Sequence, residues 1–178
     1  MKKSRKNLFC IICILFGMFS CERTIQKELS AFDQNIENLD KIAAKYPNFK
    51  NACNTLKGDG SIQMESAKKL KEEKSKLEGM SAANQIISPS WVSNLLELEN
   101  VTKRVEEKVN NVSILANAKN DENKLITSRK GESALRSVKT LIEDSEIRNS
   151  SDADAIVNEV IGILKRTESD MNQELGVN

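Results

Sequence analysis

The sequence has no histidine, and among its 178 residues it has only two prolines, seven glycines, one tryptophan and one tyrosine. Without histidine the chain lacks the commonest general base, the usual zinc ligand and every Ser-His-Asp or Cys-His arrangement. It also lacks the phosphate-binding patterns G-x-x-x-x-G-K-[ST] and G-x-G-x-x-G and the nucleophile pattern G-x-S-x-G. Its carboxylates, such as Glu72-Glu73 and Glu106-Glu107, are typical of solvated helix surface. We therefore predict that the protein is not an enzyme and has no catalytic, metal or cofactor site.

The N-terminal stretch MKKSRKNLFCIICILFGMFSC has the parts of a secretory signal. Four basic residues lead, an apolar run extends from Leu8 to Phe19, and Ser20-Cys21 stand where the chain turns charged. The run is shorter than the roughly 20 apolar residues that a membrane-spanning helix needs. The stretch ending GMFSC resembles the lipobox of bacterial lipoproteins, and Met18 fits the looser boxes of spirochaetes. That resemblance implies cleavage after residue 20 and lipidation of Cys21, whereas the alternative is a plain signal peptide with a chance cysteine.

Cleavage would change the charge and the cysteine content of the chain. The signal at residues 1–20 carries four of the 27 basic residues and none of the 26 acidic ones, so the remainder has 23 against 26 and a net charge of −3. This balance does not favour nucleic-acid binding. Cys10 and Cys13 would leave with the signal and Cys21 would carry lipid, which excludes an internal disulfide in a chain with one further cysteine. Cys53 is therefore expected to be a small buried residue or a surface thiol.

The apolar residues of the first half predict helices, because they recur at helical spacing. A heptad stripe extends from Ile25 to Tyr46 and ends at Pro47. The segment 47–61 is interpreted as a connection with at most one helical turn, since it contains Pro47 and the sequence Gly-Asp-Gly. Ser61 is expected to begin a second helix that continues to about Met80.

The second half predicts three longer helices. Ser88 is expected to cap the third helix and Pro89 to be its first residue. After a break at 117–123, a fourth helix spans about 125–142 and contains Gly131. A connection at 143–151 precedes a fifth helix, which Ser151 and Asp154 are expected to begin and which continues nearly to the C-terminus.

Helices joined by short polar segments predict an all-α protein, an antiparallel bundle of about five amphipathic helices. The bundle is expected to form a single domain over residues 21–178, lipid-anchored at Cys21. The alternative is an extended, oligomeric coiled coil. Connections every 20 to 30 residues favour the bundle, because they allow the helices to fold back on one another.

Three features could take part in binding. Trp91 is of a type favoured at interfaces, but it lies in register with an apolar stripe and is expected in the core. The lysines of KKLKEEKSK (68–76) could attract a partner or be ordinary solvated surface. The segment 116–132, ANAKNDENKLITSRKGE, is charged and lies between two strong helices, where recognition residues are often placed, although it could equally be a plain connector.

The Lys/Asn-rich chain, the relaxed lipobox GMFSC, the helical body and the scarcity of aromatic residues together resemble the outer-surface lipoproteins of Borrelia-type spirochaetes. Within that group the chain is most similar to the small factor-H-binding lipoproteins of the relapsing-fever branch. The resemblance implies anchoring in the outer membrane through Cys21, display on the cell surface and capture of host complement factor H for complement evasion. Some relatives also bind plasminogen, which is a second implied partner.

The resemblance supplies the ligand, and the charged segment 116–132 supplies an expected location for its contact. The predicted ligand-binding residues are Lys119, Asp121, Glu122, Lys124, Arg129 and Lys130. Such surface lipoproteins usually have a flexible tether after the cysteine, whereas here only Glu22-Arg23-Thr24 precede the heptads. The alternative is therefore a periplasm-facing structural or accessory lipoprotein with no host ligand.

Overall fold

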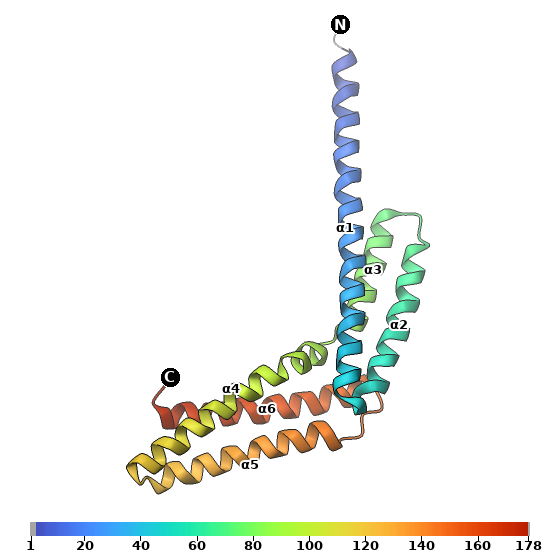
Figure 1. Cartoon of the computed structure of the whole chain (residues 1–178). Coiled ribbons are helices and arrows are strands. Elements are labelled where there is room, and N and C mark those ends of the chain that lie inside the picture. Colours follow the sequence, from blue (N-terminus) through green and yellow to red (C-terminus); the bar gives the residue numbers. More distant parts are fainter. Residues whose placement is uncertain (1–2, 178) are drawn as a thin grey trace. The chain divides into compact units, whose positions relative to one another are not determined.

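A computed structural model describes the backbone of residues 3–177 and the side chains of residues 24–177. The chain is an all-α helical bundle (Figure 1), and the described residues form six α-helices and one 3-10 turn but no strand. The elements are α1 (Lys3–Lys45), η1 (Pro47–Phe49), α2 (Lys50–Lys68), α3 (Glu73–Ile87), α4 (Ser90–Lys119), α5 (Glu122–Asp144) and α6 (Ser150–Leu175). The predicted signal at 1–20 and the predicted lipidation of Cys21 concern residues whose side chains lie outside the described set.

Contacts divide the chain into two compact units. Unit 1 comprises residues 1–37 and 56–88, and unit 2 comprises residues 38–55 and 89–178. The division falls within α1 and within α2, so each of these helices contributes one segment to each unit.

In unit 1 the described part of α1 packs with α2 and α3 around a small apolar core. Gly60 of α2 is buried there, and a Cβ at this position would lie 2.1 Å from Ile87 Cγ2 and 3.5 Å from a ring carbon of Phe32. A glycine is therefore needed for this close approach. Asn84 adds a polar link, since its side chain donates to Glu28 Oε2 at 2.8 Å and accepts from Asn35 Nδ2 at 3.3 Å.

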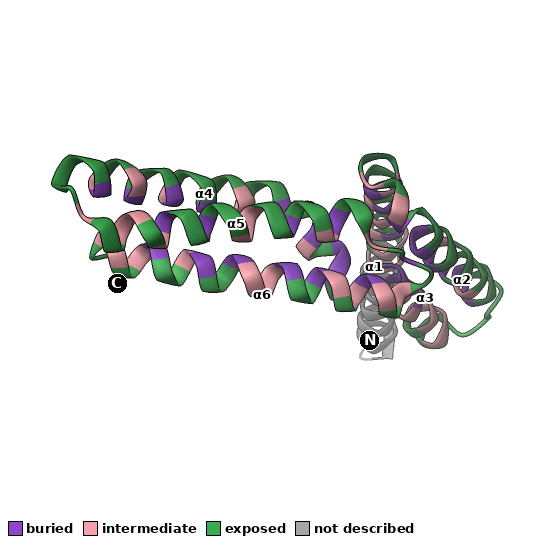
Figure 2. Ribbon diagram, turned by 90° about the horizontal axis from the view of Figure 1, so that it is seen from below, coloured by how far each residue is buried: buried purple, intermediate pink, exposed green. Residues whose placement is uncertain are grey.

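In unit 2 three long helices, α4, α5 and α6, pack side by side (Figure 1), and their buried residues face the inside of the bundle (Figure 2). Trp91 is fully buried, as predicted, and its indole nitrogen donates to Ser150 Oγ at 2.9 Å. Its ring centroid lies 5.9 Å from that of Phe49, so η1 covers this end of the bundle. Cys53 is also buried in this unit.

The prediction for residues 47–80 was wrong in two places. The expected connection at 47–61 is largely helix, because α2 continues through Gly58-Asp59-Gly60, where packing against Ile87 overrides the weak helix propensity of glycine. The expected second helix from Ser61 to Met80 is interrupted by a turn between Lys68 and Glu73. The turn falls within the lysine-rich stretch 68–76, where the exposed side chains of residues 68–74 provide no packing to hold a continuous helix.

Two helix starts also differ from the prediction. Ser88 does not cap α4; it follows α3 and its hydroxyl donates to Asn84 O at 2.6 Å, while Pro89 occupies the N-cap. Asn149 caps α6 in place of Ser151, because its Oδ1 accepts from the amides of Ser151 and Asp152 at 2.8 and 3.0 Å.

The expected break at 117–123 is much shorter than predicted. Only Asn120 and Asp121 separate α4 from α5. Asn120 ends α4 in the left-handed conformation with φ of 48°, a conformation that asparagine tolerates better than most residues. The segment 116–132 therefore consists of the end of α4, a two-residue turn and the beginning of α5.

Candidate functional site

The bundle α4–α6 is held by ion pairs along two of its three seams, where a seam is the line along which two helices meet. Between α4 and α6, Glu168 accepts from Arg104 Nε at 2.9 Å and from Lys108 Nζ at 2.7 Å. Between α5 and α6, Lys124 Nζ donates to the Glu174 carboxylate and to the Glu174 backbone carbonyl, both at 2.7 Å. Within the described part of the chain, no ion pair crosses the seam between α4 and α5.

The Glu168 network is the strongest electrostatic feature of the bundle. The hydrogen bonds from Arg104 and Lys108 lower the pKa of Glu168 from 4.5 to about 2. The Glu168 side chain is only 20% exposed, which limits screening by water, whereas Arg104 is 52% exposed. Stabilisation by this carboxylate is complete above pH 4.5 and is lost as the pH falls toward 2.

The six predicted ligand-binding residues lie at the end of the bundle where α4 turns into α5. Three of them, Asp121, Glu122 and Arg129, line one shallow hollow of about 360 Å³ together with Asn117, Asn120 and Ile126. We call this hollow and its lining residues the tip surface. It combines two carboxylates, one guanidinium and an exposed isoleucine, so it can contact a partner through both charge and apolar area.

The other three predicted residues are placed differently. Lys124 is half-buried and is engaged with Glu174, so it serves the α5/α6 seam. Lys130 lines a separate hollow of about 400 Å³ between α5 and α6. Lys119 is exposed at the last residue of α4. Asp121 also has a structural role, since its Oδ1 accepts from Lys124 N at 3.1 Å and caps α5.

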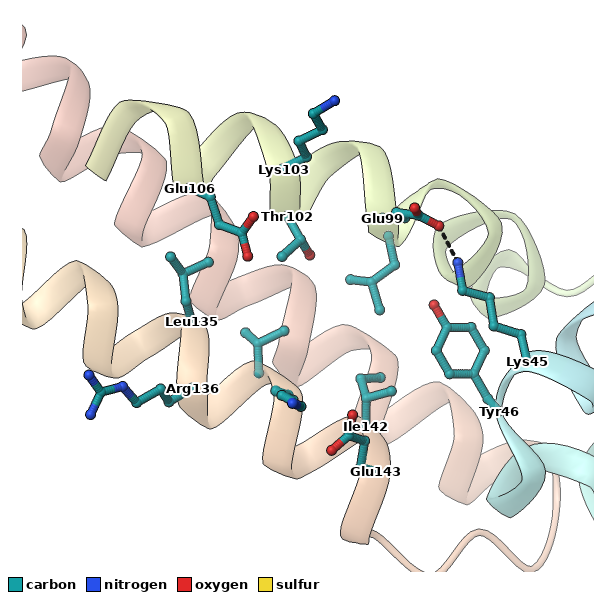
Figure 3. A pocket seen from close by; sticks show the side chains of 13 residues that line it. Lys45, Tyr46, Glu99, Thr102, Lys103, Glu106, Leu135, Arg136, Ile142 and Glu143 are labelled. Atoms are coloured by element: carbon teal, nitrogen blue, oxygen red, sulfur yellow. Dashed lines mark hydrogen bonds and ion pairs between the residues drawn. The ribbon is translucent and has the colours of Figure 1, made fainter. Parts of the chain in front are cut away.

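A larger hollow than these two lies elsewhere, in a groove of about 780 Å³ between α4 and α5 that the sequence did not reveal (Figure 3). Its floor is apolar, formed by Leu98, Leu135, Val138 and Ile142, with Thr102 between them. Tyr46 closes one end, and its ring points into the space between the two helices. Because most of the floor residues belong to the core stripes, the sequence pattern alone assigned them to packing.

Charged side chains form the rims of this α4/α5 groove. Glu99, Lys103 and Glu106 follow α4, and Arg136, Lys139 and Glu143 follow α5. At the Tyr46 end, Lys45 pairs with Glu99, which raises the pKa of Lys45 and lowers that of Glu99, and Lys45 Nζ lies 5.6 Å from the Tyr46 ring centroid. Among the described residues, Lys103, Glu106, Lys139 and Glu143 have no ion-pair partner.

No helix in the described part of the chain is long and apolar enough to cross a membrane. The described residues also contain no cluster of acidic or sulfur ligands that could hold a metal ion. No protein-family model, curated protein or solved structure matches the chain.

Proposed function

We propose that the protein is a lipid-anchored surface protein that captures host complement factor H and so protects the cell from complement. The observation that carries the proposal is the stretch GMFSC at the end of a short apolar signal, followed directly by a helical body without catalytic motifs. A lipid at Cys21 would hold the protein on the outer membrane. Plasminogen is a second candidate ligand, because it is implied by the same resemblance.

The proposed contact for factor H consists of the tip surface together with the exposed residues Lys119 and Lys130. A two-residue turn held by the Asp121 cap and by the Lys124–Glu174 pair can present charged side chains in a fixed frame. Lys119, Glu122, Arg129 and Lys130 are all exposed around this turn. Charges in such positions act mainly on the association rate and on its salt dependence.

The test is capture of purified factor H by residues 22–178 at low salt. We expect capture by the wild-type chain. Neutralising Lys119, Glu122, Arg129 and Lys130, which serve neither the cap nor the seam, should slow association and flatten its salt dependence. A chain in which exposed Lys69, Lys71, Glu72 and Lys74 are neutralised is the matched control and should bind like wild type. Absence of capture by the folded wild-type chain would reject the ligand, whereas unchanged binding by the tip variant would reject only the location.

A second candidate is a periplasm-facing structural or accessory lipoprotein with no host ligand. The observation that favours it is the short distance between Cys21 and the first heptad residue Ile25, which leaves little sequence for a flexible tether. Protease treatment of intact cells separates the two candidates. Loss of the protein supports surface display, and protection until the outer membrane is opened supports the periplasmic candidate.

A further inference from the structure

The turn between α2 and α3 lies at the end of unit 1 from which the N-terminal part of α1 extends (Figure 1). The register of the three helices follows from close contacts. A Cβ on Gly60 would meet both Ile87 and Phe32, so these three residues share one level. Asn84, three residues before Ile87, donates to the carboxylate of Glu28, four residues before Phe32, at 2.8 Å. Helix α3 is therefore parallel to α1, and α2 is antiparallel to both.

The same register places the turn level with Cys21. The turn follows Gly60 by 9 to 12 residues along α2, and Cys21 precedes Phe32 by 11 residues along α1. At 1.5 Å per helical residue, both paths span roughly 15 Å. Contact between α2 and α3 continues up to the turn, because a Cβ on Gly79 would lie 2.8 Å from Ala67 Cβ.

The tip of this turn combines positive charge with an apolar side chain. Lys69, Leu70 and Lys71 are consecutive and exposed, and Leu70 is 43% exposed. Each of the two flanking lysines forms an ion pair within its own helix, Lys68 with Glu65 and Lys74 with Glu78. Among the described residues, Lys69 and Lys71 have no ion-pair partner. The segment 68–76 has five lysines and two glutamates and so a net charge of +3.

We propose that the α2–α3 turn is a second membrane contact, in which Lys69 and Lys71 bind the phosphates of an anionic phospholipid surface and Leu70 enters the interface. The inference rests on the proposed lipid at Cys21. Each lysine near an anionic membrane favours the bound state by only roughly fivefold, so the turn alone binds weakly. Because α1 is one helix on both sides of Cys21, no flexible tether separates the lipid from the turn. The anchor therefore keeps the turn at the surface, and the turn orients unit 1 on the membrane.

The test tethers residues 22–178 to vesicles through an N-terminal hexahistidine tag and a nickel-chelating lipid. The other lipid is phosphatidylcholine alone or an equal mixture of phosphatidylcholine and phosphatidylglycerol. Mass spectrometry measures the rate at which each lysine is acetylated. We expect Lys69 and Lys71 to react about threefold or more slowly on the anionic vesicles than on the neutral ones. Lys57 should react equally on both, because it lies about 18 Å back along α2, beyond the Debye length of about 10 Å at 0.1 M salt.

Two variants make the assignment specific to the turn. Leu70→Asp should abolish the difference between the two kinds of vesicle, since it removes the apolar contact and adds a charge that the anionic surface repels. Ile62→Asp is the matched control, because Ile62 is 70% exposed on α2 and away from the turn, and it should keep the difference. Circular dichroism checks that both variants keep their helicity. Equal rates for Lys69 and Lys71 on both kinds of vesicle, equal protection of Lys57, or a difference that survives Leu70→Asp would overturn the proposal.

Failure of this inference is distinguishable from failure of the proposed function. The tag supplies the tether, so protection of the lysines is measured whether or not Cys21 carries lipid in cells. Unprotected lysines on anionic vesicles would overturn the second contact and leave the anchor standing. A native protein whose mass shows no lipid at Cys21 would overturn the anchor and, with it, the second contact.

Discussion

The two seams of α4 differ in the way they use charge. Toward α6, Arg104 and Lys108 both bond Glu168, and the three charged groups close the seam. Toward α5, Lys103 and Glu106 lie on the rim of a groove and Lys139 and Glu143 lie on the opposite rim, without an ion pair between them. Two adjacent residues of α4 thus differ in role: Arg104 forms an ion pair with α6, whereas Lys103 lies on the rim of the groove without an ion pair.

This difference separates charges that stabilise the bundle from charges that contribute little to its stability. A half-buried carboxylate with two donors adds to the stability of the fold, because each charge-assisted hydrogen bond is stronger than a neutral one. Exposed charges without partners add little to stability and remain available to a ligand. The comparison therefore predicts that substitutions of charged residues on the α6 side of α4 change the free energy of unfolding, while those on the α5 side change it little.

The largest expected loss of stability comes from a substitution in the buried core of the α4–α6 bundle. Leu98 is 5% exposed and Leu96, on the same helix, is 38% exposed. Leu98→Asp should lower the free energy of unfolding by about 3–5 kcal/mol, because it buries a charge without a partner. Leu96→Asp is the matched control and should cost less than about 1 kcal/mol. Urea unfolding measures both, and similar values for the two variants would mean that the buried face of α4 is assigned wrongly.

A smaller loss of stability is expected at Gly131, where α5 approaches α4 closely. A Cβ on Gly131 would lie 2.7 Å from Val109 Cγ2 and 3.4 Å from Met171 Cε, so Gly131→Val should destabilise the chain by about 2–3 kcal/mol through overpacking. Gly162 on α6 has no heavy atom within 4 Å of its would-be Cβ. Gly162→Val should therefore change thermal stability little. Equal destabilisation at both positions would show that helix propensity, and not the close approach of α4 and α5, decides the outcome.

Much of the fold could be predicted from the apolar spacing. The stripe of Trp91, Leu95, Leu98, Val105, Val109 and Val112 is buried in α4, and the first heptad stripe ends with α1 before Pro47. The errors occurred where local propensity and packing disagree. Gly58 and Gly60 signalled a loop, yet Gly60 is the residue that lets α2 approach α3. Caps at Asn149 and Asp121 depend on backbone geometry at the turn, which the sequence does not specify uniquely.

Less of the candidate site could be predicted. The charged segment 116–132 was identified, but its residues separate in the structure: Asp121, Glu122 and Arg129 share the tip surface, while Lys124 is committed to Glu174. The α4/α5 groove was missed, because it depends on which residues of two antiparallel helices come level with each other. Thr102, a polar residue within an apolar stripe, was the one sequence signal at the groove.

The comparison of the two seams is tested most directly by removing one carboxylate from each of them. The free energy of unfolding in urea is measured for Glu168→Gln and Glu106→Gln at pH 7 and at pH 3. We predict that Glu168→Gln costs about 1–2 kcal/mol at pH 7, a value discounted for the exposure of Arg104. Glu106→Gln should change stability by less than about 0.5 kcal/mol.

The cost of Glu168→Gln in free energy of unfolding should also depend on pH. Because Glu168 has a pKa of about 2 in the folded chain and 4.5 ordinarily, its contribution should be full at pH 7 and smaller at pH 3. The gap between Glu168→Gln and wild type should therefore narrow at pH 3, while Glu106→Gln stays close to wild type at both. Equal costs for the two variants at pH 7, or a gap for Glu168→Gln that does not narrow at pH 3, would contradict this account.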